Sequence, residues 1–296
     1  MKITDADFAR LREIRASAPA VLNTLVAARS RRDRATSDGR LFIIAADHPA
    51  RGALGVRDNP MAMASRYDLL ERLVTALSRP GVDGVLGTPD IIDDLAALGA
   101  LEDKIVIGSM NRGGLRGASF EMDDRFTAYD IAEIVRAKID FAKVLLRINL
   151  TDAGSAATIE ASAAAVSAAA AAGVPIMIEP FMSGWHEGRI ANDLSTDAVI
   201  SSISIAAGLG VSSAWSWLKL PVVPDMERVM AATTLPTVLL GGDPTARPDD
   251  TYASWAEALV LPGVYGLVVG RTLLYPVNDD VAAAVDVASS LVHPIS

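Results

Sequence analysis

The chain lacks cysteine and has few basic residues, and each of these features excludes some kinds of chemistry or binding partner. It has 296 residues and no cysteine, which excludes disulfide bonds, thiolate catalysis and thiolate metal ligation. Its 27 basic residues are outnumbered by 36 acidic ones, giving a net charge of -9. That balance argues against a surface that binds nucleic acid or anionic membranes.

Long apolar runs are also missing. The opening residues Met1–Asp7 lack the apolar core of a signal peptide. The nearest candidate for a membrane span is the alanine-rich stretch Ala161–Ala172, which is too short to cross a bilayer and is expected to be a packed helix. We therefore expect a soluble cytoplasmic protein with neither a membrane nor a nucleic-acid partner.

Lysine is scarce, which makes the position of Lys219 informative. The other lysines are Lys2, Lys104, Lys138 and Lys143, and every remaining basic residue is arginine. Lys219 stands in an apolar stretch that is typical of a buried strand, where an ammonium ion is disfavoured. Lysine can lose its proton and arginine cannot, so this position favours amine chemistry, above all a Schiff base. A snorkelling or ion-paired lysine accounts for the segment alone about equally well.

Short apolar runs alternate with helical stretches along the rest of the chain. The runs are Leu41–Ala46, Gly84–Gly87, Ile105–Gly108, Val144–Asn149, Pro175–Pro180, Trp215–Leu220, Thr237–Gly241 and Tyr265–Gly270. Eight strand-then-helix units predict an α/β fold, a (β/α)₈ TIM barrel, with an open doubly wound sheet as the alternative. Before them, helical spacing from about Asp5 to Arg34, broken at Pro19, predicts an N-terminal helical extension. We expect residues 1–40 to form that extension and residues 41–296 a single catalytic barrel domain.

Active sites of such barrels lie where the strands end, so polar residues near those ends are the candidates. Side-chain alternation allows Lys219, Glu179, Asp47 and Lys143, the candidate catalytic residues, to point into the barrel. Arg147 shares a face with Lys143 and is expected to bind the substrate there. Two lysines can tune one another, and carboxylates can carry their protons. The alternatives are a barrel-bottom ion pair for Lys143, a helix cap for Asp47 and a structural pair between Glu179 and Arg147.

Glycine-rich ends follow the last two predicted strands. Loops after strands seven and eight commonly bind phosphate in these barrels, and Gly241, Gly242, Gly270 and Arg271 stand there. Glycines also end strands for steric reasons. Arg112 belongs to a basic, glycine-containing loop that could clamp the far end of an anionic substrate or simply be solvated.

A metal site is not expected. His48, Glu179 and His186 could in principle hold a divalent ion, but no H-E-x-x-H motif supports it. His48 also alternates away from Asp47, unless the strand has already ended there.

Four motifs on separate strands resemble one enzyme family. They are Ala45-Ala-Asp47-His-Pro-Ala-Arg51-Gly, Ala142-Lys143-Val-Leu-Leu, Ile178-Glu179-Pro180 and Leu218-Lys219-Leu-Pro. In order and placement they are similar to the class I aldolases of the deoxyribose-phosphate aldolase/tagatose-1,6-bisphosphate aldolase superfamily. The likeness runs from Leu41 to about Pro276 and is greatest to the tagatose-1,6-bisphosphate branch and its relatives in sulfosugar and inositol-phosphate breakdown.

The resemblance implies a role for each candidate. Lys219 would form the Schiff base, with Asp47, Lys143 and Glu179 in the same pocket. Gly241, Gly242, Gly270 and Arg271 would hold a phosphate. The chain departs from the family in its Asp-His-Pro sequence after the first strand, in Arg147 where relatives often carry an aromatic residue, and in the double tryptophan before Lys219.

The expected function is a Schiff-base-forming aldolase that cleaves a phosphorylated ketose, releasing dihydroxyacetone phosphate and an aldehyde. It would need no cofactor beyond the covalent imine at Lys219, and its partner would be a small phosphorylated sugar; a homo-oligomer is compatible with the composition. The alternatives are a sugar-phosphate isomerase or a metal-dependent aldolase on the same barrel, or a non-catalytic sugar-phosphate-binding protein. The sequence leaves the sugar and the stereochemistry open.

Overall fold

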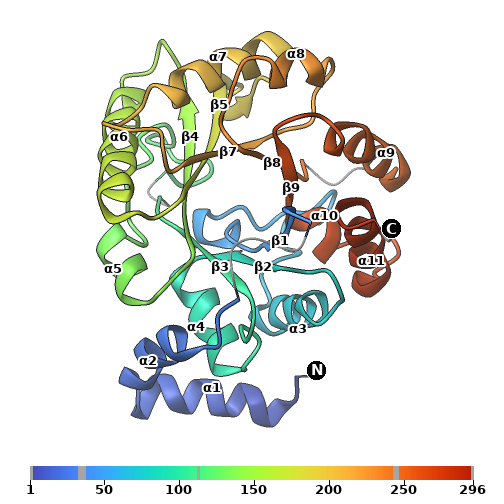
Figure 1. The fold of residues 1–296 in the computed structure, drawn as a ribbon. Helices are drawn as coiled ribbons and strands as arrows, with labels where there is room; N and C mark the ends of the chain where they lie inside the picture. Colours follow the sequence, from blue (N-terminus) through green and yellow to red (C-terminus); the bar gives the residue numbers. More distant parts are fainter. Residues whose placement is uncertain (1–2, 33–37, 112–113, 243–246, 295–296) are drawn as a thin grey trace.

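A closed barrel of eight parallel strands, ringed by helices, forms the body of the protein (Figure 1). The computed structural model describes residues 3–32, 38–111, 114–242 and 247–294. Strand β1 pairs with both β2 and β9, and β4 pairs with β5, so that the parallel sheet closes on itself. The predicted (β/α)₈ barrel is confirmed, and the open doubly wound sheet is wrong.

The barrel strands coincide with the apolar runs of the sequence, to within a few residues at most ends. They are β1 (Leu41–Ala45), β2 (Gly84–Gly87), β3 (Ile105–Ser109), β4 (Phe141–Ile148), β5 (Ile176–His186), β7 (Ser216–Leu220), β8 (Thr237–Leu240) and β9 (Val264–Val269). Strands covered on both faces need apolar side chains on both, which is why continuous runs rather than alternating ones mark them.

Each strand is followed by a helix with a buried face. The helices are α3 (Arg66–Leu77), α4 (Pro89–Ala97), α5 (Ile131–Arg136), α6 (Gly154–Ala172), α7 (Thr196–Ala207), α8 (Met226–Met230), α9 (Pro248–Leu259), and after β9 both α10 (Arg271–Leu274) and α11 (Val281–Val292). By length and composition alone α6 could cross a membrane, and no other helix of the described residues could. Here α6 packs along β4, and it extends beyond the alanine-rich run seen in the sequence.

Two hydrophobic clusters divide the core. Large side chains such as Ile43, Ile107, Phe141 and Met177 fill the inside of the barrel, while a larger cluster lies between strands and helices. Trp217 packs edge-on against Phe141 with ring centroids 5.5 Å apart. Because side chains two apart on a strand share a face, Lys219 points to the same interior as Trp217.

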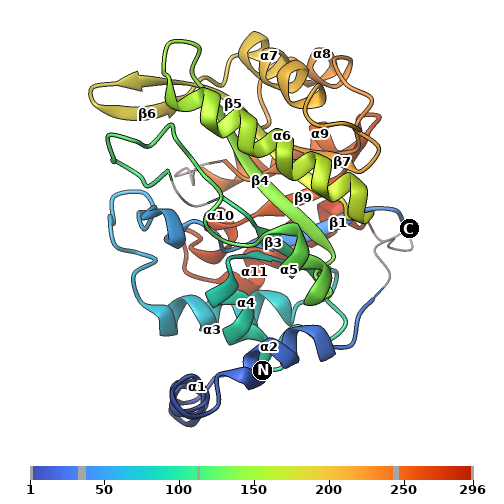
Figure 2. The ribbon, with the colours of Figure 1, turned by 90° about the vertical axis from the view of Figure 1, so that its left-hand side faces the viewer.

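The N-terminal helices lie on the outside of the barrel, as Figure 2 shows. Helices α1 (Asp5–Ser17) and α2 (Ala20–Ala28) are separated at Pro19, and Thr4 caps the first of them. Helix α2 packs against α4, and buried Arg29 donates to Asp140 at 2.7 Å. The predicted break at Pro19 is confirmed; the division at residue 40 remains a prediction.

The fifth barrel strand continues past its predicted end. Residues Ser183–His186 pair antiparallel with β6 (Arg189–Asn192), and the resulting hairpin projects beyond the barrel (Figure 2). Exposed strand residues carry no apolar run, and Pro180 suggested an end to the strand, so the sequence pattern missed this hairpin.

Candidate active site

Four strands bring the candidate catalytic side chains to one end of the barrel. Asp47 closely follows β1, and Lys143, Glu179 and Lys219 lie in β4, β5 and β7. All four are buried, with Lys143 only 2% and Lys219 4% exposed. Their side chains meet inside the barrel, as side-chain alternation predicted.

Their charged groups form a continuous chain of alternating sign. Nζ of Lys219 lies 2.8 Å from Oε1 of Glu179, and Nζ of Lys143 lies 2.5 Å from Oε2 of the same carboxylate. Lys143 also reaches Oδ2 of Asp47 at 3.1 Å. Lys143 therefore does not form a barrel-bottom pair: it links Asp47, just after β1, to Glu179 in β5.

The shared carboxylate of Glu179 is kept ionised by its two partners. Burial acts to raise the pKa of Glu179, but the ammonium groups of Lys143 and Lys219 outweigh burial and hold that pKa well below its usual range. Two cations and two anions thus balance inside the barrel, which makes their joint burial tolerable.

Two further polar residues border this chain, and sequence reasoning did not select either. Ser109, the last residue of β3, donates its hydroxyl hydrogen to Oδ2 of Asp47 at 3.3 Å. His48 brings Nδ1 to 3.7 Å from Oδ1 of Asp47. Because β1 ends at Ala45, His48 no longer alternates away from Asp47; only the strand boundary, invisible in the sequence, would have revealed this.

The loops after β8 and β9 lie side by side, as expected of a phosphate site. The Thr272 hydroxyl donates to the Gly241 carbonyl at 3.4 Å, and Gly242 has a φ of 66°, in the left-handed region. A Cβ at Gly241 would lie 2.5 Å from the Val269 side chain, and one at Gly270 2.5 Å from the Ala45 carbonyl oxygen. Close packing alone therefore requires glycine at positions 241 and 270, whether or not a phosphate binds there. Residues 243–246 lie outside the described residues.

Arg271 begins helix α10 and faces the β1 loop, where it donates to the Gly55 carbonyl at 3.5 Å. It is also close enough to lower the pKa of His48. Its guanidinium group thus lies on the same side of the site as His48, between the loops after β9 and β1.

Arg147 pairs with the loop after β3. Its guanidinium group lies 2.6 Å from Glu121 and 3.9 Å from Asp124, so the alternative of a structural pair with Glu179 is excluded, and its predicted role in substrate binding stays a prediction. Arg51 joins the same cluster, 2.7 Å from Asp124. These four buried side chains fasten the β3 loop to β4 and to the segment after β1. Arg112, expected to bind the substrate, lies outside the described residues.

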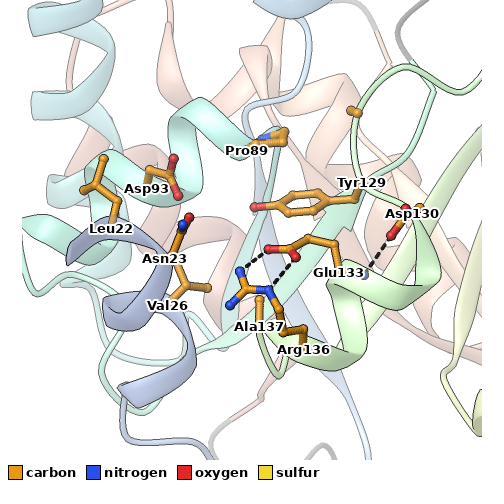
Figure 3. Close-up of a pocket in the computed structure, with 11 residues that line it drawn as sticks. Leu22, Asn23, Val26, Pro89, Asp93, Tyr129, Asp130, Glu133, Arg136 and Ala137 are labelled. Carbon is orange, nitrogen blue, oxygen red and sulfur yellow. Dashed lines mark hydrogen bonds and ion pairs between the residues drawn. The ribbon is translucent and has the colours of Figure 1, made fainter. Parts of the chain in front are cut away.

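Outside this site, a polar pocket lies between α2, α4 and α5 (Figure 3). Its carboxylates already have partners: Glu133 pairs with Arg136, Asp130 caps α5, and Asp93 lies 4.0 Å from Arg15. Across the described part of the chain, no cluster of three or more histidine and carboxylate side chains is arranged to hold a metal ion.

Comparison with known proteins gives a family and a fold. The model of the Cgl0159-like family matches residues 39–289. The crystal structure of Cgl0159 from Corynebacterium glutamicum is 65% identical, covers 98% of each chain and superimposes with a TM-score of 0.96. No curated protein is significantly similar in sequence.

More distant structures share the barrel. A Schiff-base-forming fructose-1,6-bisphosphate aldolase is 19% identical over 92% of this chain and 100% of its own, with a TM-score of 0.63. An archaeal fructose-1,6-bisphosphate aldolase, whose catalytic lysine is covalently bound to a carbinolamine intermediate, is 20% identical over 92% of this chain and 99% of its own, also with a TM-score of 0.63. At this identity the likeness is one of fold.

Proposed function

The chain belongs to the Cgl0159-like family, and on that premise we propose that it is a Schiff-base-forming class I aldolase acting on a phosphorylated ketose. The observation that carries the proposal is the chain Lys219–Glu179–Lys143–Asp47 inside the barrel. It supplies an amine nucleophile with an adjacent proton acceptor and a second cation. The shared fold with Schiff-base-forming fructose-1,6-bisphosphate aldolases agrees with it.

Lys219 is the proposed nucleophile. Its ammonium group gives up a proton through Glu179, 2.8 Å away, and the free amine adds to the ketose carbonyl carbon to form a carbinolamine. The same proton then reaches the carbinolamine hydroxyl, which leaves as water and gives a protonated imine. Because its pKa is low, Glu179 relays this proton rather than keeping it, and Lys143, which contacts the other oxygen of Glu179, keeps that carboxylate oriented.

The protonated imine then acts as the electron sink. The bond between the α and β carbons of the imine breaks, and its electron pair forms an enamine. The hydroxyl group on the β carbon loses its proton as that carbon becomes the aldehyde and departs. Protonation of the enamine carbon and hydrolysis of the imine release the second product, proposed to be dihydroxyacetone phosphate. The sequence left Glu179 and Asp47 as candidates for the base that accepts the hydroxyl proton. Because Glu179 already exchanges a proton with the Lys219 amine, Asp47 is the better candidate of those two.

The phosphate would lie between the loops after β8 and β9. Gly241, Gly242 and Gly270 bring backbone close to that space, and Arg271 supplies a fork of N–H donors suited to an anion. The narrower resemblance to the tagatose-1,6-bisphosphate aldolase branch, and with it the sugar, is part of this proposal. So are a cytoplasmic location and a small phosphorylated sugar as partner.

Borohydride trapping tests the proposal. Borohydride added with dihydroxyacetone phosphate should reduce the imine and leave a stable mass adduct on Lys219. Lys219→Ala should give no adduct. Lys104→Ala is the control: Lys104 donates a hydrogen bond to the Val82 carbonyl away from the site, so this variant should form the adduct as the wild type does. Absence of an adduct in the wild type, or an undiminished adduct in Lys219→Ala, would contradict the proposal.

A further inference from the structure

His48 lies beside Asp47 with its two ring nitrogens in different surroundings. Its side chain is 26% exposed although Nδ1 is buried, so the open part of the imidazole is the side that carries Nε2. Its Nδ1 is buried and makes no hydrogen bond to the described residues, since the 3.7 Å to Asp47 is too long for one. Nδ1 therefore lies near the Asp47 carboxylate, while Nε2 is the ring nitrogen left for a bound substrate; a buried Nδ1 without a close partner is unusual in a purely structural residue.

The surroundings place the imidazole between the two halves of the site. A Cβ on Gly270 would lie 3.1 Å from Cε1 of His48, so the ring borders the loop proposed to bind phosphate. The charged groups that act on it come from several strands of the barrel: Asp47 beside it, Arg271 after β9, Lys219 on β7, Glu179 on β5 and Lys143 on β4.

Burial and the nearby positive charges keep the ring neutral. Burial, followed by the positive charges of Arg271 and Lys219, lowers the pKa of His48 well below its usual value, and Glu179 opposes them less strongly. A neutral imidazole can accept a proton and give it back. The two lysines and Glu179, in contrast, are held in ion pairs with one another. Oδ2 of Asp47 pairs with Lys143 and accepts a hydrogen bond from Ser109.

We propose that His48 is a catalytic acid–base residue of the aldolase reaction, accepting the substrate's hydroxyl proton at carbon–carbon cleavage and returning it to the enamine carbon. The proposal rests on the proposed function and replaces Asp47 in that step. When the bond breaks, its electrons form the enamine and neutral His48 becomes an imidazolium, beside the carboxylate of Asp47. When the enamine carbon takes that proton, the protonated imine is restored and His48 is neutral again, so that no outside proton is needed.

Hydrogen exchange separates this step from imine formation. In deuterated water, the imine of dihydroxyacetone phosphate exchanges a proton of its hydroxymethyl carbon with solvent through the enamine, and this can be followed by proton NMR. In His48→Ala, we expect the borohydride adduct on Lys219 to form within about threefold of the wild-type rate. We expect the exchange to slow by about 10²-fold or more, the usual contribution of an acid–base residue.

Added imidazole distinguishes a chemical role from a structural one. It should restore part of the exchange in His48→Ala and none in Lys219→Ala; His48→Gln, closer in size, is measured in parallel in case the alanine variant does not fold. Exchange within threefold of the wild type in a folded His48 variant that still forms the adduct overturns the role of His48. Failure of the wild type itself to form an adduct overturns the proposed function instead, and this inference with it.

Discussion

Lys143 and Lys219 bind opposite oxygens of a single carboxylate, that of Glu179, at 2.5 and 2.8 Å. The two lysines come from strands on either side of β5, and they meet because β4 and β7 both pair with it. The shared carboxylate fixes the position of each amine and gives each a nearby acceptor for a proton. Sequence order would not suggest this coupling, since Glu179 is 40 residues from Lys219.

Removal of the shared charge should disable the site. In Glu179→Gln, two ammonium groups face one neutral amide, so the proton acceptor of Lys219 is lost. We expect imine trapping with dihydroxyacetone phosphate to slow by about 10²-fold or more. Removing one member of such a buried network should also lower the free energy of unfolding by about 3 kcal/mol. The measurements are borohydride trapping followed by mass spectrometry and urea unfolding.

Glu187→Gln is the matched control, because Glu187 is an exposed glutamate of the β5–β6 hairpin. It should leave both trapping and stability as in the wild type. Rapid trapping in Glu179→Gln would show that another group takes the proton of Lys219.

The proposed phosphate site makes a prediction about substrate choice. Arg271→Met removes the guanidinium group at the start of α10. Because a hydrogen bond to a charged group contributes about 1.5–3 kcal/mol, the KM for dihydroxyacetone phosphate in trapping should rise by about 10–100-fold. Trapping of unphosphorylated dihydroxyacetone should change little. Arg228→Met, which removes an exposed arginine paired with Asp197, controls for the lost charge. Equal losses with both substrates would place Arg271 outside the phosphate site.

The sequence predicted the barrel and the buried chain of ion pairs inside it for the same physical reason. A parallel sheet buried on both faces requires apolar runs. Ionisable residues within such runs, such as Lys143 and Lys219, are costly to bury unless they have charged partners, so they mark a polar site inside the barrel. Their inward direction followed from the alternation of side chains along a strand. What could be predicted was therefore whatever depends on regular backbone geometry.

The contacts that the sequence did not reveal lie where the backbone is irregular. A pair between Arg147 and Glu179 was one alternative, but the partner of Arg147 is Glu121, from the loop after β3, whose path no periodicity reveals. His48 was set aside because its direction depended on where β1 ends. Predicting either contact needs the loop conformation, which is set by tertiary packing rather than by local pattern.

The cluster around Arg147 should be structural. Arg147→Met leaves the carboxylates of Glu121 and Asp124 buried with less compensation, so the free energy of unfolding should fall by about 3–5 kcal/mol. Arg125→Met removes an arginine that is 71% exposed and paired with Asp123, and it should cost less than about 1 kcal/mol. Urea unfolding of both variants makes the comparison. If Arg147→Met retains wild-type stability but loses affinity for dihydroxyacetone phosphate, Arg147 binds substrate after all.

Stability should decline in acid, and His48 accounts for part of that decline. The folded protein lowers the pKa of His48 from its usual 6.5 and that of Glu179 from its usual 4.5, so in each case the unfolded chain binds more protons. The free energy of unfolding must then rise with pH in those windows, and fall as pH drops below about 6.5 for His48 and below about 4.5 for Glu179. His293 acts in the opposite sense, because its hydrogen bond to Asp83 raises its pKa and stabilises the fold most below 6.5.

The test compares the free energy of unfolding in urea at about pH 7.5 and about pH 5.5, which bracket the usual histidine pKa of about 6.5. It is measured for the wild type and for His48→Asn. The variant keeps His293, so the opposing contribution of that residue is the same in both proteins. The wild type should lose more stability between the two pH values than the variant does. Equal losses would mean that His48 is protonated as readily in the folded barrel as in the unfolded chain.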